Sequence, residues 1–257
     1  MHPGVSRRPW LCYLQSKMRT SVDDFSSGSN APVALASPAA GVTLWWTTLA
    51  RNDDEFAHVS AWLAPQEHAR AARFGRESLR RRYIIGRASL RWVLGRSLGL
   101  SPAAVPIVRG ARGRPQLEGQ SALDFNISHT EGVALIGIGR GSRIGVDVED
   151  AEREVNADGL ARKFLMASEQ ATLASLDEHA RRSRFLRYWT CKEAMSKATG
   201  DGLAAPFRHL EVKLNRTIEL VAGPAPYDAP SWRLHAVDVP AGFIATIALW
   251  TRDLPAP

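Results

Sequence analysis

The sequence has very little cysteine and no long apolar run. Cys12 and Cys191 are the only cysteines in 257 residues, which excludes a disulfide-stapled scaffold and fits a reducing compartment. The longest apolar runs, near residues 134–138 and 243–250, are far shorter than the about 20 residues that a membrane-spanning helix needs. We therefore expect a cytoplasmic protein that does not span a membrane.

The chain is also short of acidic residues. It has 33 Lys and Arg against 26 Asp and Glu, a formal charge of +7 and a pI near 9.9. Such a balance favours an anionic partner, which can be nucleic acid, an anionic membrane or a phosphorylated small molecule. Because 45% of the residues are hydrophobic, the chain can bury a core, and wholesale disorder is excluded.

All of the excess positive charge lies in one segment. Residues 67–96 contain nine arginines and two acids, Glu67 and Glu77, a difference of +7. Apolar residues recur there at three- and four-residue steps from Leu79 to Leu94, which predicts an amphipathic helix. Arginine suits bidentate phosphate binding, although a charge run is more commonly a helix face in contact with water.

The order of the predicted elements indicates an α+β protein with two halves of similar plan. Strands are predicted at 42–49, 105–108, 124–128, 133–138, 144–148, 211–214, 218–221, 232–237 and 243–250. Helices are predicted after the first strand, up to about residue 98, and again over 157–199. We predict an N-terminal half at 41–141 and a C-terminal half at 142–257, after a serine- and proline-rich extension at 1–40 that we expect to be disordered.

The strand at 144–148 carries a candidate metal site. Side chains alternate along a strand, so Asp147 and Glu149 share one face while Val146 and Val148 share the other. Two carboxylates about 7 Å apart on one face repel each other unless a cation lies between them. Mg²⁺ is the natural occupant for oxygen ligands, and a solvent-facing strand edge is the simpler alternative.

A second candidate group lies on the predicted helix that ends before Gly200. Trp189, Glu193 and Lys197 are spaced at i, i+4 and i+8, so they form one stripe. Glu193 can supply a third oxygen to a metal, and Lys197 can meet a phosphate. The simpler alternative is an intrahelical Glu–Lys pair beside a buried tryptophan. Gly200 is suited to cap the helix.

A third group surrounds the segment from Gly113 to Thr130. Arg114 follows Gly113, and His129 ends a short polar strand. A lone histidine in this position is more often a polar surface residue than a catalyst. Cys191 has no paired base in the sequence, and we interpret it as a packing residue.

Together, in this order and spacing, these motifs resemble the Sfp-type 4′-phosphopantetheinyl transferase family, which modifies carrier proteins of polyketide, nonribosomal-peptide and fatty-acid synthesis. The resemblance covers roughly residues 60–205. The matching pieces are Arg82-Tyr-Ile-Ile-Gly86, Gly113-Arg-Pro115, Phe125-Asn-Ile-Ser-His129, Gly145-Val-Asp-Val-Glu149, Lys163-Phe164 with Ser168-Glu169, and Trp189-Thr-Cys-Lys-Glu-Ala194 with Lys197.

The resemblance implies a fold of two pseudo-symmetric α+β halves, with coenzyme A and Mg²⁺ bound in the cleft between them. By motif position, Asp147, Glu149 and Glu193 would hold Mg²⁺. A serine of an apo acyl or peptidyl carrier protein would attack the phosphorus bonded to the pantetheine arm and release 3′,5′-ADP. Glu193, or a water that it shares with the metal, would be the base, and Lys197 would neutralise the leaving phosphate.

The resemblance also implies the contacts to coenzyme A. His129 and Arg114 would grip the 3′-phosphate and nucleotide end, and Arg82 and Arg70 would add phosphate contacts. Lys192 is expected to be a phosphate ligand and not a base. We expect a monomer, since single-chain relatives contain both halves of the site. Carrier proteins of this class are typically acidic, so we expect a basic surface for the partner.

Two features depart from the family pattern. Asp201 stands in the G-x-G-L turn where many members carry lysine, and Gly113-Arg-Pro115 replaces the commoner Gly-Lys-Pro. Two other functions account for part of the sequence. A Mg²⁺-dependent nuclease or nucleotidyl transferase would explain the basic charge but not the helix motif at 189–197, and the three intact carboxylates argue against an inactive carrier-binding protein. We therefore expect neither nucleic acid nor a membrane as a partner.

Overall fold

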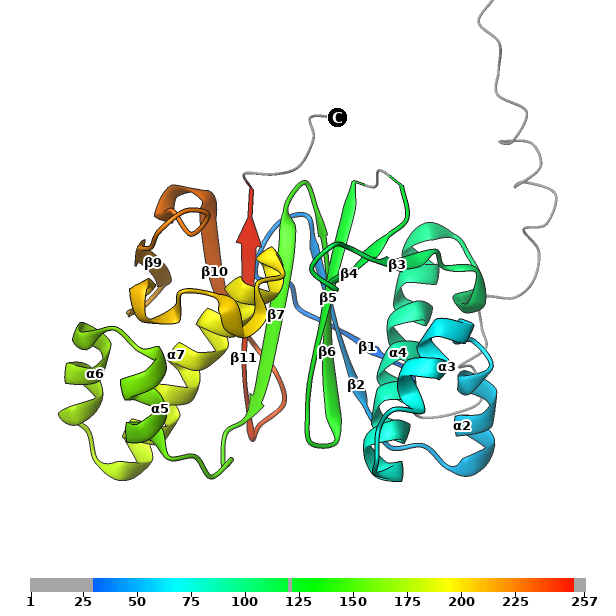
Figure 1. Cartoon of the computed structure of the whole chain (residues 1–257), viewed down its shortest axis with the longest axis horizontal. Coiled ribbons are helices and arrows are strands. Elements are labelled where there is room, and N and C mark those ends of the chain that lie inside the picture. The colour runs from blue at the N-terminus through cyan, green and yellow to red at the C-terminus, as the bar shows by residue number, and fades with distance from the viewer. Residues whose placement is uncertain (1–29, 120–121, 252–257) are drawn as a thin grey trace, which may run out of the picture.

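The computed structural model describes residues 30–119 and 122–251. In these residues a four-stranded and a five-stranded β-sheet meet in the middle of the molecule, with helices on both outer sides, and a separate two-stranded sheet accompanies them (Figure 1). The strands are β1 (Val33–Leu35), β2 (Val42–Thr48), β3 (Ile107–Arg109), β4 (Pro115–Leu117), β5 (Leu123–Thr130), β6 (Val133–Arg140), β7 (Arg143–Asp150), β8 (Glu211–Leu214), β9 (Ile218–Ala222), β10 (Trp232–Val237) and β11 (Phe243–Trp250). The helices are α2 (Asp53–Ser60), α3 (Pro65–Ala71), α4 (Glu77–Leu98), α5 (Ala157–Phe164), α6 (Ala167–Ala174) and α7 (Glu178–Thr199).

The two halves repeat one plan, as the order of elements predicts. Each half has a long strand (β2 or β7), three helices of which the last has 22 residues (α4 or α7), a short hairpin (β3–β4 or β8–β9) and a long hairpin (β5–β6 or β10–β11). The sheet orders correspond as well, because β2-β6-β5 in the first sheet matches β7-β11-β10 in the second. The α+β, pseudo-symmetric fold is thus confirmed, and we propose that the halves divide near Gly141.

Both 22-residue helices end for the same local reason. The residue after α4 is Gly99 and the residue after α7 is Gly200, and both adopt the left-handed conformation, with φ of 69° and 85°. A residue with a Cβ adopts this conformation only at a cost, so glycine is the usual helix terminator. Gly200 therefore caps the helix as its position in the sequence predicts.

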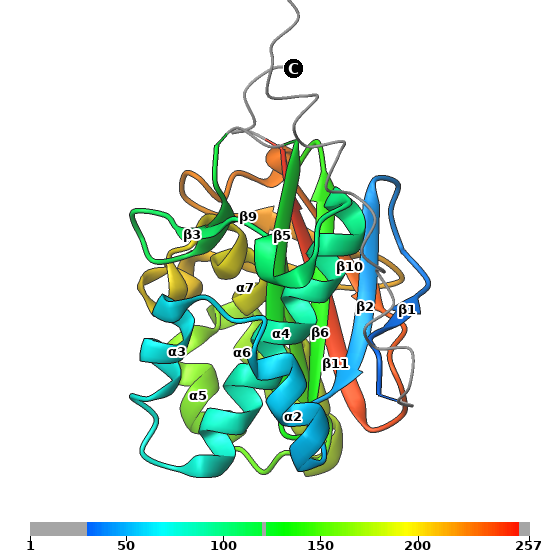
Figure 2. The ribbon, with the colours of Figure 1, turned by 90° about the vertical axis from the view of Figure 1, so that its right-hand side faces the viewer.

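Three larger hydrophobic cores and one small cluster around Leu49, Ile85 and Ala134 hold the described elements together. One lies between α4 and the first sheet, and a second lies between α7 and the second sheet. The third joins the two sheets through alternate residues of β2, β6, β7 and β11, among them Leu44, Leu135, Val146 and Ile247. Figure 2, turned by 90°, shows helices α2, α3 and α4 in front of the strands. On β7 this alternation directs Val146 and Val148 toward the first sheet, so Asp147 and Glu149 face α7.

Within the 1–40 extension that we expect to be largely disordered, the described residues 30–40 include a short strand. Residues 33–35 form β1, which pairs antiparallel with β2 at Val33–Trp46, Ala34–Trp45 and Leu35–Leu44. Residues 1–29 lie outside the described residues. Among the helices that the structure describes, none combines the length and apolar character needed to cross a membrane.

Candidate active site

The edge strands of the two sheets, β5 and β7, lie side by side and are joined by side chains (Figure 1). Alternate side chains of β5 accept hydrogen bonds from alternate backbone N–H groups of β7. The pairs are Asp124 with Ile144 at 2.8 Å, Asn126 with Val146 at 3.1 Å and Ser128 with Val148 at 3.3 Å. This side-chain ladder satisfies buried backbone donors and fixes the register between the two halves.

Asp147 lies at the centre of the candidate site and is 3% exposed. Its Oδ1 accepts hydrogen bonds from Lys197 Nζ at 2.5 Å and from Ser128 Oγ at 2.9 Å. Its Oδ2 is buried and has no hydrogen-bond partner among the described residues. An unpartnered buried carboxylate oxygen costs free energy, so this atom is suited to receive a ligand.

Glu149 shares the face of Asp147, as strand alternation predicts. Its Oε2 lies 2.7 Å from the Arg153 guanidinium, and its Oε1 accepts a hydrogen bond from Trp189 Nε1 at 3.0 Å. Trp189 lies on α7 and Glu149 on β7, so the tryptophan of the predicted helix stripe faces the carboxylates. Trp189 also packs against Phe164 and Phe207, which shields one side of Glu149 from water.

Glu193 lies between Trp189 and Lys197 on the same stripe. The pKa of Glu193 is raised to about 6, chiefly by burial; Lys197 lowers it, and the negative charges of Asp147 and Glu149 raise it. Lys197 pairs with Asp147 and not with Glu193, so the alternative of an ordinary intrahelical pair is wrong. The three predicted carboxylates therefore share one electrostatic environment.

The close approach of α7 to β7 depends on Gly145. A Cβ at this position would lie 1.8 Å from the backbone oxygen of Ala194 and 2.7 Å from the amide nitrogen of Ala198. No side chain fits in that space. The glycine two residues before Asp147 thus lets the helix lie directly on the strand and brings Glu193 and Lys197 to the two carboxylates.

In this arrangement the chain's own cations neutralise the carboxylates. Over the described ranges, no three or more His, Cys, Asp or Glu side chains are grouped so that they could hold a metal ion together. Lys197 pairs with Asp147, and Arg153 pairs with Glu149. The unpartnered, buried Oδ2 of Asp147 nevertheless fits a site for a hard cation with oxygen ligands.

Arg114 is not placed as a phosphate ligand, which corrects the expectation for this residue. Its side chain is 6% exposed and makes a bidentate ion pair with Asp124 at 2.6 and 2.8 Å. Its remaining donors reach the backbone carbonyls of Phe125, Ile144 and Lys197 at 2.8 to 3.0 Å. Because these partners come from β5, β7 and α7, Arg114 connects the two halves behind the site.

Lys192 is also buried in an ion pair and is not accessible to a phosphate. Its side chain is fully buried and its Nζ lies 2.6 Å from Glu169 Oε2, with the carbonyl oxygens of Phe164 and Phe207 as further acceptors. Burial lowers the pKa of Lys192 and raises the pKa of Glu169, and the charge of each partner opposes the shift of the other. The expectation of a phosphate ligand is therefore wrong for Lys192, which ties α6 to α7.

The other predicted coenzyme A residues lie at the surface of the N-terminal half. His129 is exposed and immediately follows Ser128 on β5. Arg82 is partly exposed and pairs with Glu131 in the β5–β6 turn at 2.5 Å. Arg70 is exposed, and its guanidinium lies 6.0 Å from the centre of the Tyr83 ring. These three residues remain accessible to a ligand.

A pocket of about 340 Å³ lies between α3, α4 and the β3–β4 hairpin, and the sequence did not indicate it. Glu67, Tyr83, Arg87 and Arg109 are among its lining residues. Arg87 is 8% exposed and lies 3.3 Å from Glu67, while its Nη1 has no hydrogen-bond partner among the described residues. The signal available in the sequence was Glu67, one of only two acids within the arginine-rich segment.

Asp201 connects the loop around Arg112 to the end of α7. It forms an ion pair with Arg112, and its other oxygen accepts a hydrogen bond from the buried Tyr227 hydroxyl at 2.6 Å. Thr199 shares that hydroxyl at 2.8 Å. The residue that departs from the family pattern is thus part of a network between the two halves.

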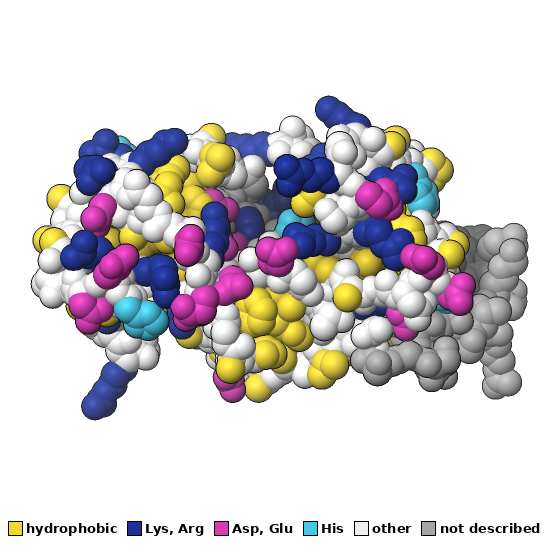
Figure 3. Space-filling view, turned by 90° about the horizontal axis from the view of Figure 1, so that it is seen from below, with side chains coloured by type: hydrophobic (Ala, Val, Ile, Leu, Met, Phe, Trp, Pro, Cys, Tyr) yellow, Lys and Arg dark blue, Asp and Glu magenta, His cyan; other side chains and the backbone are white. Residues whose placement is uncertain are grey.

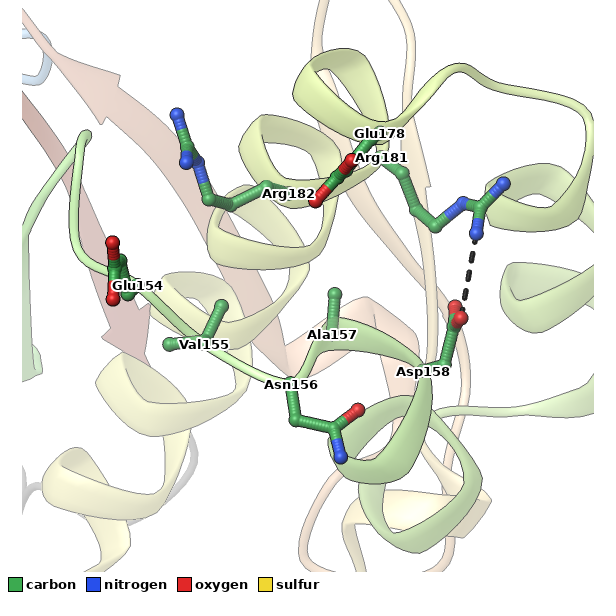
Figure 4. Close-up of a pocket in the computed structure, with 8 residues that line it drawn as sticks. All are labelled: Glu154, Val155, Asn156, Ala157, Asp158, Glu178, Arg181 and Arg182. Carbon is green, nitrogen blue, oxygen red and sulfur yellow. Dashed lines mark hydrogen bonds and ion pairs between the residues drawn. The ribbon is translucent and has the colours of Figure 1, made fainter.

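A groove of about 650 Å³ lies on the C-terminal half between the loop after β7 and the start of α7 (Figure 4). Its two arginines already have partners, since Arg181 pairs with Asp158 and Arg182 with Glu152. Seen from below, basic and acidic side chains are interspersed over both halves (Figure 3). That face therefore lacks the continuous basic surface that binds nucleic acid.

Comparisons with known proteins all point to the family that the sequence motifs resemble. Residues 143–248 match the family described as the 4′-phosphopantetheinyl transferase superfamily, and residues 46–138 match the N-terminal region of 4′-phosphopantetheinyl transferase. The chain is 35% identical over 212 residues to the 4′-phosphopantetheinyl transferase HetI of Nostoc sp. strain PCC 7120, covering 81% of this chain and 87% of that protein. It is 27% identical over 187 residues to a 4′-phosphopantetheinyl transferase of Bacillus subtilis, covering 69% and 80%.

Proposed function

This chain belongs to the 4′-phosphopantetheinyl transferase superfamily, and from that premise we propose how its carboxylate site performs the transfer. The enzyme moves the 4′-phosphopantetheine arm of coenzyme A to a serine of an apo carrier protein. The serine oxygen forms a bond to the phosphorus that carries the pantetheine arm, and the bond from that phosphorus to the nucleotide breaks. The products are phosphopantetheinyl carrier protein and 3′,5′-ADP. Nothing in the comparisons supports the nuclease alternative.

Asp147, Glu149 and Glu193 would hold Mg²⁺. The unpartnered Oδ2 of Asp147 is the observation that carries this assignment. Lys197 and Arg153, which pair with two of these carboxylates here, mark positions where positive charge is favourable. When bound, Mg²⁺ neutralises the charge of the pyrophosphate as a hard, oxygen-binding Lewis acid.

Glu193 is the proposed base that takes the proton from the carrier serine hydroxyl. It lies on the α7 stripe beside Asp147 and Glu149, and partial burial raises its pKa to about 6, nearer to the value that suits a base at neutral pH. Lys197, one turn further along, has its Nζ at the same centre and would stabilise the negative charge that develops on the leaving phosphate. A water next to Glu193 is the alternative acceptor of the proton.

Coenzyme A would bind along the N-terminal half. Arg82, His129 and Arg70 are accessible at this surface, and the pocket lined by Tyr83 and Arg87 would take the nucleotide end. An arginine with an unpartnered, buried Nη1 favours a phosphate there. Arg114 and Lys192 would act indirectly, by holding the halves and the helices that carry these ligands.

The proposed partner is an acidic carrier protein. Because Ser128 comes from the N-terminal half and Asp147, Glu193 and Lys197 from the C-terminal half of one chain, we propose that the enzyme acts as a monomer.

The sparse cysteine supports a cytoplasmic location.

The deciding experiment incubates the protein with coenzyme A, Mg²⁺ and an apo carrier protein and weighs the carrier by mass spectrometry. The expected result is a gain equal to one phosphopantetheine group, which is lost when EDTA replaces Mg²⁺. No gain in mass across acyl and peptidyl carriers would overturn the proposed activity. A gain that persists in EDTA would overturn the role of Mg²⁺.

A further inference from the structure

The Ser128 hydroxyl makes three hydrogen bonds at the centre of the site, and together they use its whole capacity. It donates to Asp147 Oδ1 at 2.9 Å and accepts from Lys197 Nζ at 2.8 Å and from the backbone N–H of Val148 at 3.3 Å. A hydroxyl offers one donor and two acceptor positions. With its residue 4% exposed, this hydroxyl is fixed in one orientation.

These hydrogen bonds involve only one of the two carboxylate oxygens of Asp147. Ser128 and Lys197 both donate to Oδ1, at 2.9 and 2.5 Å, so this oxygen accepts two hydrogen bonds. The other oxygen, Oδ2, is buried and has no hydrogen-bond partner among the described residues. The two oxygens of the Asp147 carboxylate therefore have different roles. Oδ1 holds the side chain in place, and Oδ2 is available as a ligand for a cation.

We propose that Ser128 is a positioning residue that locks Asp147 by its Oδ1 and thereby presents Oδ2 to the divalent cation. The proposal rests on the proposed function of this site, since Asp147 is one of its metal ligands. Ser128 comes from β5 of the N-terminal half, whereas Asp147 and Lys197 come from β7 and α7. The assembly of the two halves thus completes the metal site, although the proposed metal ligands come from one half.

Asn126 provides a matched control for this role. It precedes Ser128 by two residues on β5 and accepts the N–H of Val146 at 3.1 Å, as Ser128 accepts the N–H of Val148. Within the described part of the chain, it has no hydrogen bond to Asp147 or Lys197. Removing either side chain breaks one rung of the ladder between the halves, but only removal of Ser128 releases Asp147.

The test compares Ser128→Ala, Ser128→Cys and Asn126→Ala with the wild type. Mn²⁺ binding is measured directly by electron paramagnetic resonance on the protein without coenzyme A, and transfer is measured against Mg²⁺ concentration. Ser128→Cys fills the space of the hydroxyl with a weak donor and acceptor, so it tests the proposal if the alanine variant does not fold.

We expect both Ser128 variants to bind Mn²⁺ about 10- to 100-fold more weakly, as losing a group that orients a metal ligand typically does. At saturating Mg²⁺ their kcat should return to near the wild-type value, but the Mg²⁺ concentration that gives half-maximal transfer should rise. Asn126→Ala should lose thermal stability but keep the Mn²⁺ affinity of the wild type.

Equal Mn²⁺ affinity in the Ser128 variants and in Asn126→Ala would overturn the role of Ser128 and leave the proposed function standing. A wild-type protein that transfers phosphopantetheine but binds no Mn²⁺ would overturn both the metal assignment and this inference. Absence of both binding and transfer would overturn the proposed function itself.

Discussion

Gly145 on β7 lies directly beneath the backbone oxygen of Ala194 on α7, with room for a hydrogen atom only. A Cβ at Gly145 would lie 1.8 Å from that oxygen, far inside a van der Waals contact. The backbone of α7 cannot yield without moving Glu193 and Lys197, which flank Ala194 on the same helix. One glycine therefore sets the distance between the strand that carries Asp147 and the helix that carries the proposed base.

Gly145→Ala is expected to lower the free energy of unfolding by at least about 1–3 kcal/mol, because overpacking of a close contact forces the backbone apart. Transfer activity should fall as well, even at temperatures where the variant is folded. Urea unfolding and single-turnover transfer measure the two effects. Gly86→Ala is the control, since its Cβ would make only ordinary contacts at 3.7 and 3.8 Å and alanine favours the helix. A Gly145 variant as stable as the Gly86 variant would contradict the contact.

Glu193→Gln and Asp147→Asn are expected to lower kcat by at least about 100-fold, because the first removes the proposed base and the second a proposed metal ligand. The measurement is the rate of transfer to carrier protein at saturating coenzyme A and Mg²⁺. Asp150→Asn, at the end of the same strand, serves as the matched carboxylate control. Among the described residues, its Oδ1 accepts a hydrogen bond from the nearby Glu152 N–H and contacts none of the proposed site residues, so this variant should stay near wild-type activity. Full activity in either of the first two variants would contradict the site.

Lys192→Met is expected to destabilise the fold by about 3–5 kcal/mol, because it leaves the buried Glu169 without its partner. Adding Glu169→Leu should restore much of this loss, since removing both charges leaves no unpaired ion. Chemical unfolding of the two single variants and the double variant measures the coupling. Additive effects would contradict the buried pair. If Lys192 bound phosphate instead, its replacement would raise the KM for coenzyme A without this loss of stability.

Asp201→Ala is expected to lower the free energy of unfolding by about 1–3 kcal/mol, because the buried Tyr227 hydroxyl loses an acceptor. A double-mutant cycle with Tyr227→Phe measures the interaction, which should account for much of the loss. Independent effects of the two substitutions would show that the hydrogen bond contributes nothing.

Cys191 is expected to resist thiol reagents in the folded protein. Burial raises the pKa of its thiol to about 12, so the folded state favours the neutral thiol, and at pH 8 only about 10⁻⁴ of it would be the reactive thiolate. Labelling with an aromatic disulfide in a Cys12→Ser background should therefore proceed only as fast as the protein opens. Rapid labelling of the native protein at pH 8 would contradict the burial of this cysteine.

The local patterns of the sequence predicted much of the fold and the core of the site. Apolar and polar alternation at 144–148 predicted that Asp147 and Glu149 share a face, and they do. The four-residue spacing of Trp189, Glu193 and Lys197 predicted one stripe, and that stripe faces the carboxylates. Such patterns succeed because strand and helix geometry is set by neighbours within a few residues.

The net positive charge of the sequence did not show which Arg and Lys side chains are exposed. Arg87 and Arg91 share the buried Glu67, Arg114 holds Asp124, and Lys192 holds Glu169. In the sequence these cations look the same as Arg70, which remains exposed. Charge counts therefore indicated an anionic ligand without showing which cations were available to it.

The sequence by itself determined the family, the two-half plan and the carboxylates that face α7, because each follows from local spacing and motif identity. Only the tertiary structure decided that Arg114 and Lys192 point inward and that Ser128 anchors Asp147. The physical reason is that a buried cation or hydroxyl needs a partner to replace water. Those partners lie 10 residues from Arg114, 23 from Lys192 and 19 from Ser128, beyond the reach of helix or strand periodicity.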